Sequence, residues 1–272
     1  MVEYVIANAT VVPVRENPSE GAEQLTQLLF GEVCEVLDRL PRWTKIRSTL
    51  DTQEGWVDFK MVSLASSLIA SSPHRLEAVV AAPMAAATPM DGGADLLLTL
   101  GTRLPNYSHG TFEVLGQQYL IDPTCVNNTT QLLNSDLSRA ELLNNVCATA
   151  QTLLNAPYLW GGKNLMGMDC SGFTQVVYAA MGVNLLRNAR EQMTQGELIP
   201  CLSDAQPGDL AFFDHADRDP KATNISHVGL LLSPTEIIHC SGCVHIDTID
   251  EQGIHLPDGS LTHHLVQIKR YL

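Results

Sequence analysis

The sequence of 272 residues has few charged side chains, and most of its charges are acidic. Charged residues make up 17%, with 16 Lys and Arg against 30 Asp and Glu, which gives a formal net charge of −14 at pH 7. The sequence also has no basic stripe and no glycine-rich phosphate loop. Because a chain this acidic is repelled by nucleic acid and by anionic lipid, neither is expected as a partner.

Long apolar runs are missing as well. No segment reaches the roughly 18 consecutive apolar residues that a membrane span needs, and the N-terminal MVEYV does not resemble a secretory signal. We therefore expect no membrane partner and a cytoplasmic location, or an exported form if a leader has been removed. Hydrophobic residues still reach 45% of the chain, which is typical of a folded protein and not of a disordered one.

The seven cysteines form no regular pattern. Their odd number and irregular spacing argue against a disulfide framework. One CxxC motif, CSGC at 240–243, lies between His239 and His245. A structural zinc site of this kind needs a second pair of ligands at a similar spacing, and no second CxxC is present. We therefore expect no metal and no cofactor.

Three parts of the chain differ in their residue patterns. Residues 1–64 contain short runs that alternate at period two, separated by polar turns, which indicates a small barrel or sandwich. Residues 65–80 begin with a Ser- and Ala-rich stretch that is typical of a linker. A second β-rich part follows over 75–130, and its pattern of short strands and turns is similar to that of the first part. A helix-rich texture begins at 138 and continues into strands up to 272.

The part from 138 to 272 is predicted to be α+β. Ser138 with Glu141 makes a capping box for a first helix. A second helix is predicted over 170–181, with Asp169 placed to cap it and Gly182 placed to end it. Four strands are expected later, over 210–213, 227–232, 236–239 and 265–268. Helices followed by strands favour an α+β domain over βαβ repeats.

One cysteine and two histidines could act together. Cys170 lies at the start of the second helix, where the helix dipole favours a thiolate and should lower the thiol pKa, although Asp169 opposes this as a like charge. His227 and His239 lie on consecutive strands joined by a short turn, so the two rings can lie side by side. One imidazole could then act as the base and the other could orient it. The His263-His264 pair is expected at the surface.

Each of these residues also has a structural interpretation. A single cysteine in such a segment is more often part of the core, and a single strand histidine is more often a satisfied or exposed residue. The combination of a thiol at a helix start with two histidines on adjacent strands favours nucleophilic catalysis, and the residue pattern by itself leaves both interpretations open.

Five separated motifs resemble those of the NlpC/P60 cysteine peptidases, in the same order. They are PYLWGG at 157–162, DCSGF at 169–173, QPGDL at 206–210, HVG at 227–229 and IHCSG at 238–242. The N-terminal part resembles bacterial SH3 domains through EQLTQ at 23–27, FGE at 30–32, Trp43 and EGWV at 54–57. The whole layout resembles the γ-D-glutamyl-L-diamino acid endopeptidases, in which two SH3-like domains precede the catalytic one.

This resemblance implies a papain-like NlpC/P60 domain over 138–272, preceded by two small all-β SH3-like barrels over 1–64 and 75–130. It also implies that Cys170 is the nucleophile, His227 the base and His239 the residue that orients it. Tyr158 would help the oxyanion site. The reaction would be hydrolysis of the γ-D-glutamyl–diamino acid bond (diaminopimelate or lysine) through an acyl thioester, and the partner would be a peptide derived from peptidoglycan.

Substrate-binding residues also follow from the resemblance. Asp169 and Glu23 would bind the free amine of an N-terminal L-alanine, and Ser171 and Trp160 would contact the substrate. Two positions depart from the relatives. Gln53 stands where a tyrosine that contacts the amine is expected, and Ala189 stands in place of a serine.

Three functions therefore remain open from the sequence. The first is a peptidase of small released muropeptides, active in murein peptide recycling. The second is an endopeptidase or amidase of the intact wall. The third is a non-catalytic wall-peptide binding protein, which the complete Cys–His–His set argues against.

Overall fold

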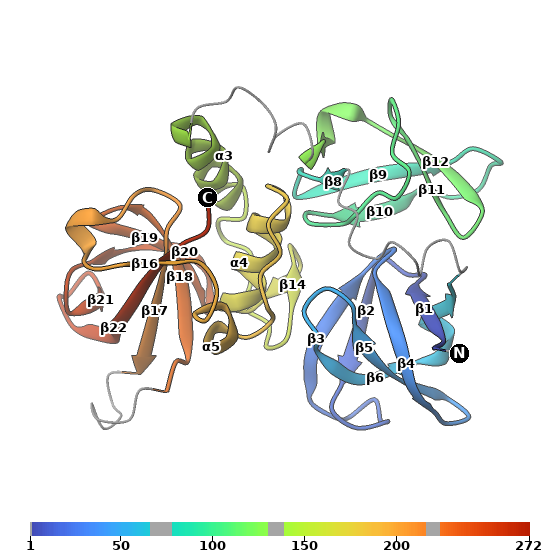
Figure 1. The fold of residues 1–272 in the computed structure, drawn as a ribbon, viewed down its shortest axis with the longest axis horizontal. Coiled ribbons are helices and arrows are strands. Elements are labelled where there is room, and N and C mark those ends of the chain that lie inside the picture. Colours follow the sequence, from blue (N-terminus) through green and yellow to red (C-terminus); the bar gives the residue numbers. More distant parts are fainter. Residues whose placement is uncertain (1, 66–77, 130–138, 216–223) are drawn as a thin grey trace.

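The structure is a computed structural model, and it describes residues 2–65, 78–129, 139–215 and 224–272. Figure 1 shows three bodies: a first β unit at the lower right, a second β unit at the upper right and a C-terminal domain at the left. The predicted linker over 65–80 falls largely on 66–77, outside the described residues, but its last two residues form the strand β8 (Val79–Val80). The predicted cap Ser138 also lies outside the described residues.

The first β unit is a single antiparallel sheet, with the strand order β3-β2-β6-β5-β4-β1-β7. Its apolar side chains alternate with polar ones and enclose a small core that includes Val12, Ile46 and Val57. The strands are β1 (Tyr4–Ala7), β2 (Val11–Arg15), β3 (Gln24–Leu29), β4 (Val33–Arg39), β5 (Trp43–Ser48), β6 (Glu54–Asp58) and β7 (Val62–Leu64), with a 3-10 turn over Phe59–Met61 between the last two.

The second β unit has a four-stranded sheet in the order β10-β9-β12-β11 and a separate β8–β13 pair. Its core is continuous with part of the first unit, because Ile6, Phe30 and Val33 pack in the same cluster as Leu104 and Phe112. Because the two units share this cluster, the packing does not separate them, and the predicted domain limits of 1–64 and 75–130 stay predictions. The strands are β8 (Val79–Val80), β9 (Met84–Pro89), β10 (Leu96–Thr99), β11 (Thr111–Val114), β12 (Gln117–Ile121) and β13 (Val126–Asn127); a 3-10 turn covers Pro123–Cys125.

Helices precede the main sheet in the C-terminal domain. Its sheet runs β16-β22-β17-β18-β19-β20-β21, and an additional β21–β22 pairing closes it into a barrel. The helices are α3 (Arg139–Gln151), α4 (Cys170–Ala179) and α5 (Ala189–Gln192), with a 3-10 turn over Leu202–Asp204. The strands are the hairpin β14 (Lys163–Asn164) and β15 (Gly167–Met168), then β16 (Glu197–Ile199), β17 (Leu210–His215), β18 (His227–Ser233), β19 (Glu236–Ser241), β20 (Cys243–Ile249), β21 (Gly253–His255) and β22 (Leu261–Arg270).

The main core of this domain lies between α4 and the sheet. Phe173 and Val177 of α4 pack in one buried cluster with Phe212, Val228 and Ile238 of the strands. Figure 1 shows α4 lying between the sheet and the two β units. This position places the first residue of α4 beside the start of β18.

The predicted α+β class is confirmed, and all four predicted strands of this domain are present. The helix predicted over 170–181 ends at Ala179, two residues early, and its last turn continues to Gly182 with a positive φ of 83°. The strand β20 was not predicted. Among the described residues, no helix is both long enough and apolar enough to span a bilayer.

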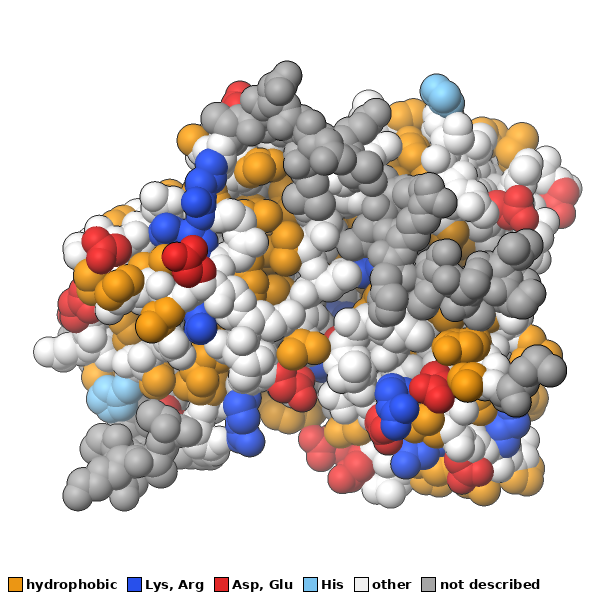
Figure 2. Space-filling view, viewed as in Figure 1, with side chains coloured by type: hydrophobic (Ala, Val, Ile, Leu, Met, Phe, Trp, Pro, Cys, Tyr) orange, Lys and Arg blue, Asp and Glu red, His pale blue; other side chains and the backbone are white. Residues whose placement is uncertain are grey.

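Charged side chains on the face shown in Figure 2 are scattered, with basic ones often beside acidic ones on the first β unit. Arg47 of this unit pairs with both Glu35 and Glu54, and Arg39 pairs with Glu3. Such pairing leaves little positive charge to attract a polyanion, in agreement with the acidic composition.

Candidate active site

The start of α4 is shaped by a capping aspartate and a close backbone contact. Asp169 has extended backbone angles, and its carboxylate accepts a 2.7 Å hydrogen bond from the Gly172 N–H, as the sequence predicts. A Cβ on Gly172 would lie 2.1 Å from the carbonyl oxygen of Gly162. Only glycine therefore fits at this position of the DCSGF segment, and the helix start is held against the loop of residues 159–162.

Cys170 is buried at this helix start, with 8% of its surface exposed. The backbone N–H groups of Val228 and Ser171 hydrogen-bond to its sulfur, which places the thiol beside the residue that follows His227. Burial, helped by the nearby Asp169 charge, raises the pKa of the Cys170 thiol to about 12. The expectation of a lowered thiol pKa is therefore wrong for the free protein, because desolvation outweighs the helix-start donors.

The two predicted histidines are brought together. His227 opens β18, and His239 lies on β19 opposite Gly229. The Nε2 atom of His227 lies 2.8 Å from Nδ1 of His239, and both side chains are buried. The prediction that the hairpin places the two rings side by side is therefore confirmed, and one hydrogen bond joins them.

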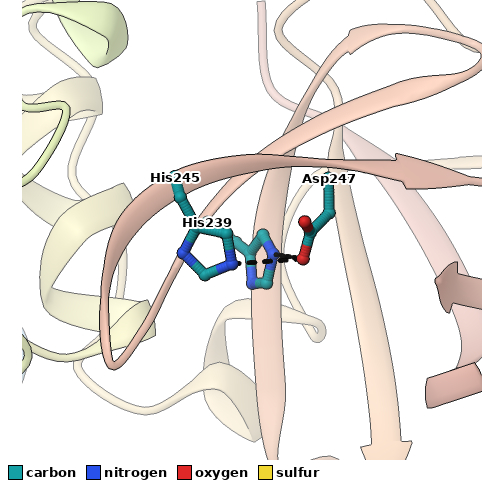
Figure 3. A group of neighbouring side chains, drawn as sticks. All are labelled: His239, His245 and Asp247. Atoms are coloured by element: carbon teal, nitrogen blue, oxygen red, sulfur yellow. Dashed lines mark hydrogen bonds and ion pairs between the residues drawn. The ribbon is translucent and has the colours of Figure 1, made fainter. Parts of the chain in front are cut away.

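Two further residues extend this chain, and the sequence analysis missed their part in it. Asp247 Oδ2 lies 3.1 Å from Nε2 of His239 and 3.1 Å from Nε2 of His245. Figure 3 shows the three side chains facing one another. Nδ1 of His245 lies 2.8 Å from the carbonyl oxygen of Cys243. Burial lowers the pKa of His239, and the hydrogen bond from His239 lowers the pKa of Asp247.

A signal for both residues was present in the sequence. Gly242 makes the turn between β19 and β20 with a φ of 74°. Counting outward from this turn pairs His239 with His245 across the ladder, and Asp247, two residues further on, falls on the same face. The CVHIDTI segment alternates as a strand should, which would have predicted β20.

The hydrogen-bond partners assign the protons on the rings. An ionised Asp247 can only accept, so His239 must carry its proton on Nε2 and leave Nδ1 bare. The bare Nδ1 can then accept only from a His227 that is protonated on Nε2. In its neutral form, His227 then carries its lone pair on Nδ1, which is the state that a general base needs.

His263 also belongs to this group of rings. Its ring centroid lies 4.4 Å from that of His227, and the side chain is buried. The prediction of a surface His263-His264 pair is therefore wrong for His263, because β22 is paired on both sides and turns this residue inward. Phe213 lies on the neighbouring strand, 6.1 Å from the His227 ring.

Tyr158 lies within electrostatic reach of Cys170 and is partly exposed. Its backbone N–H donates to the Gly242 carbonyl, so the β19–β20 turn fixes the segment that carries it. Burial raises the pKa of the Tyr158 phenol, and the negative potential of Cys170 and Asp169 adds to the effect. The phenol therefore stays protonated at neutral pH and can donate a hydrogen bond.

The first β unit brings Glu23 to the same side of the molecule. Trp160 is 60% exposed, and its Nε1 donates to Glu23 Oε1 at 2.7 Å. Gln24 Nε2 donates to the Trp160 carbonyl at 3.0 Å. The structure thus brings together two residues that were predicted to bind substrate and that lie 137 positions apart.

Asp169 does not have the free charge that the prediction gave it. Arg187 donates to both of its carboxylate oxygens, at 3.0 and 2.6 Å, and the Gly161 N–H donates a further bond at 2.9 Å. Both side chains are buried. Ser171 lies in the same network, since its hydroxyl bonds to Arg187 and Asp169. The substrate-binding roles expected of Asp169 and Ser171 stay predictions.

The two positions that depart from the relatives lie near each other. Gln53 Oε1 accepts from Asn188 Nδ2 at 3.5 Å, and Ala189 follows Asn188 as the first residue of α5. An amide of the first β unit therefore faces an amide of the C-terminal domain at this point, and the same Asn188 Nδ2 also donates to Glu191 Oε2 at 3.1 Å.

A buried polar interface holds the first β unit in place. Lys163 Nζ lies 2.9 and 3.0 Å from the two carboxylate oxygens of Glu32. Gln27 Oε1 accepts from the backbone of Lys163 and from the side chain of Asn164. Thr26 accepts from Arg187 at 2.7 Å. These bonds connect β3 directly to the hairpin and the loop that flank Cys170.

Comparison with known families agrees with this geometry. Residues 155–264 match the model of the NlpC/P60 family, and residues 10–63 match the bacterial SH3 domain. The chain therefore carries an NlpC/P60 domain behind a bacterial SH3 domain. The resemblance stated from the five motifs is confirmed, and the SH3-like nature of the second β unit stays a prediction.

Among curated proteins, the chain is similar to two enzymes named gamma-D-glutamyl-L-lysine dipeptidyl-peptidase. The protein of Bacillus subtilis (strain 168) is 28% identical over 79% of this chain and 71% of its own length. That of Bacillus cereus (strain ATCC 10987 / NRS 248) is 27% identical over 79% and 66%. A crystal structure of an NlpC/P60 family protein from Bacillus cereus shares the fold, with a TM-score of 0.80, 20% identity and 99% coverage of both chains.

Proposed function

We propose that the protein is a cysteine endopeptidase that cleaves the γ-D-glutamyl–diamino acid bond of small peptides released from peptidoglycan, in murein peptide recycling. The observation that carries the proposal is the hydrogen-bonded chain from Asp247 through His239 to His227. The next residue along the chain, Val228, donates its backbone N–H to the Cys170 sulfur. The names of the two Bacillus relatives support the substrate class.

The first chemical step is attack by sulfur. Since burial keeps the Cys170 thiol protonated at rest, His227 must take the proton through Nδ1 as the sulfur attacks the γ-carbonyl carbon. The positive charge that forms on His227 is stabilised through His239 by the Asp247 carboxylate. Asp247 thus acts as a positioning residue, because it fixes the tautomer of His239 without touching the substrate.

The developing oxyanion needs donors that are already in place. The backbone N–H of Cys170 at the start of α4 and the protonated phenol of Tyr158 can supply them. Collapse of the tetrahedral intermediate breaks the C–N bond, and His227 gives its proton to the leaving amine. Water then hydrolyses the thioester, with His227 again acting as the base, and the γ-carboxyl of D-glutamate is released.

The contact between Glu23 and Trp160 favours small peptides over the intact wall. This contact joins the first β unit to the loop that precedes Cys170. A long peptidoglycan chain therefore has less room on that side of the site than a short peptide has. The Glu23 carboxylate can also bind a substrate ammonium at this point, and its hydrogen bond from Trp160 would then be replaced by one from the ammonium. A free N-terminal amine on the substrate would suit this environment.

The test compares L-Ala-γ-D-Glu-L-Lys and its diaminopimelate counterpart with N-acetylated forms and with insoluble peptidoglycan. Release of the dipeptide L-Ala-D-Glu is measured by liquid chromatography and mass spectrometry. We expect hydrolysis of the free-amine peptides and loss of activity in Cys170→Ala. Preferred cleavage of insoluble peptidoglycan would instead support an endopeptidase of the wall, and stoichiometric binding without any cleavage would support a binding protein.

A further inference from the structure

We propose that His239, His245 and Asp247 form a binding site for a divalent zinc ion, and that zinc bound there switches the peptidase off by reversing the tautomers of its two histidines. The binding half of the proposal stands on geometry alone. The inhibitory half rests on the proposed function.

The three side chains already converge on one point. One ligand atom from each of them lies within 4.8 Å of the others. Asp247 Oδ2 lies 3.1 Å from Nε2 of both rings. Tetrahedral zinc with bonds of about 2.0–2.1 Å would separate its ligand atoms by about 3.4 Å. Small side-chain shifts would therefore admit the ion, and Figure 3 shows the three groups facing one another.

The second bond of each ring is already made. Metal-bound histidines normally donate their other ring N–H to a nearby acceptor, which fixes the ring and its tautomer. Nδ1 of His245 faces the Cys243 carbonyl at 2.8 Å, and Nδ1 of His239 faces Nε2 of His227 at 2.8 Å. Both rings can therefore keep these contacts while Nε2 turns its lone pair to the metal.

The site is also reachable from solvent. The His245 side chain is 33% exposed, whereas that of His239 is buried at 2%. An ion could enter from the His245 side, with water filling the fourth position. The cysteines of the CSGC motif do not belong to this group, which differs from the cysteine-based site considered from the sequence.

Zinc at this site would invert the proton order along the chain. With the metal on Nε2, a neutral His239 must carry its proton on Nδ1 and donate it to Nε2 of His227. His227 would then hold its own proton on Nδ1 and have no lone pair there for the Cys170 proton. The site would thus inhibit without contacting the sulfur or blocking the substrate.

The first experiment measures binding in Cys170→Ala, which removes zinc capture by the thiol. Competition between this protein and a chromophoric zinc chelator should give one equivalent bound. Adding His245→Gln should weaken the affinity by at least about 10–100-fold, since loss of a ligand should cost no less than loss of an outer partner. The matched control is His255→Gln, which removes another histidine paired with an aspartate, Asp250, and should leave the affinity unchanged. Equal affinity in all three proteins would overturn the site.

The second experiment follows the ring protons by nitrogen-15 NMR of the same Cys170→Ala protein. We expect the Nε2–H tautomer of His239 and His227 without metal and the Nδ1–H tautomer with zinc. Unchanged tautomers on zinc saturation would overturn the mechanism of inhibition.

The third experiment uses the active protein with L-Ala-γ-D-Glu-L-Lys. Zinc should inhibit it, and the concentration for half inhibition should rise in His245→Gln, measured against the metal-free rate of that variant. Equal inhibition of both proteins would overturn the regulatory role. A protein that binds zinc as expected but never cleaves the peptide would refute the proposed function and leave the metal site standing.

Discussion

The buried ion pair between Lys163 and Glu32 offers a direct test of how the first β unit is held to the catalytic domain. The side chains are 7% and 5% exposed, and the ammonium contacts both carboxylate oxygens. Glu32→Gln keeps the shape of the side chain but leaves the Lys163 charge without its partner. Removing one partner of a buried pair typically costs about 3–5 kcal/mol.

A second carboxylate places the expected cost at the lower end of this range. Burial raises the pKa of Asp51, but the Lys163 ammonium and several hydrogen bonds outweigh it, so the pKa is lowered overall. The Asp51 carboxylate would therefore still stabilise the Lys163 charge in Glu32→Gln. We expect a loss of about 3 kcal/mol, which corresponds to a fall in Tm of roughly 6–12 °C at ~2–4 °C per kcal/mol. Urea and thermal unfolding followed by circular dichroism measure both quantities.

The matched control is the exposed pair between Arg39 and Glu3, whose side chains are 44% and 45% exposed. Glu3→Gln should cost at most about 0.5–1 kcal/mol because water screens this pair. The double variant Glu32→Gln/Lys163→Met should recover part of the loss, since it leaves no buried charge unpaired. If Glu32→Gln and Glu3→Gln destabilise the protein equally, the pair does not hold the interface.

Three further predictions concern the site. Asp247→Asn should lower kcat by about 10²–10⁴-fold because an amide can hold His239 in the wrong tautomer; the surface change Asp250→Asn should leave kcat unchanged, and equal rates in all three proteins would refute the role of Asp247. Tyr158→Phe should cost about 10²–10³ in kcat if the phenol donates to the oxyanion, and a change confined to KM would remove it from that role. Since burial raises the pKa of the Cys170 thiol to about 12, the thiolate fraction should grow with pH, and alkylation of the peptide that contains Cys170 should rise about tenfold per pH unit from pH 7 to 9; a plateau near pH 6 would contradict this.

The three residues Cys170, His227 and His239 could be predicted from local sequence. Cys170 was found because Asp169 marks a helix start and Gly182 a helix end, and the predicted cap is present. His227 and His239 were found because a short turn joins two apolar strands, and this hairpin determines which residues face each other. Such features depend on neighbours in the chain, where periodicity and turn chemistry are informative.

The rest depends on contacts between distant segments. Arg187 pairs with Asp169 from 18 positions away, and local periodicity does not predict this contact. Glu32 meets Lys163 across 131 positions, and no periodicity reports such a pairing. Asp247 could have been found by counting outward from Gly242, whereas the inward turn of His263 depends on the closure of the barrel by β22.

The central claim is that Cys170 attacks the substrate and carries the acyl group. Rapid acid quench during turnover of L-Ala-γ-D-Glu-L-Lys, followed by peptide mapping, would show this intermediate directly. The account predicts an L-Ala-D-Glu acyl group on Cys170, none on the neighbouring buried Cys240, and neither adduct nor hydrolysis in Cys170→Ala. An adduct on another residue, or undiminished hydrolysis by Cys170→Ala, would contradict it.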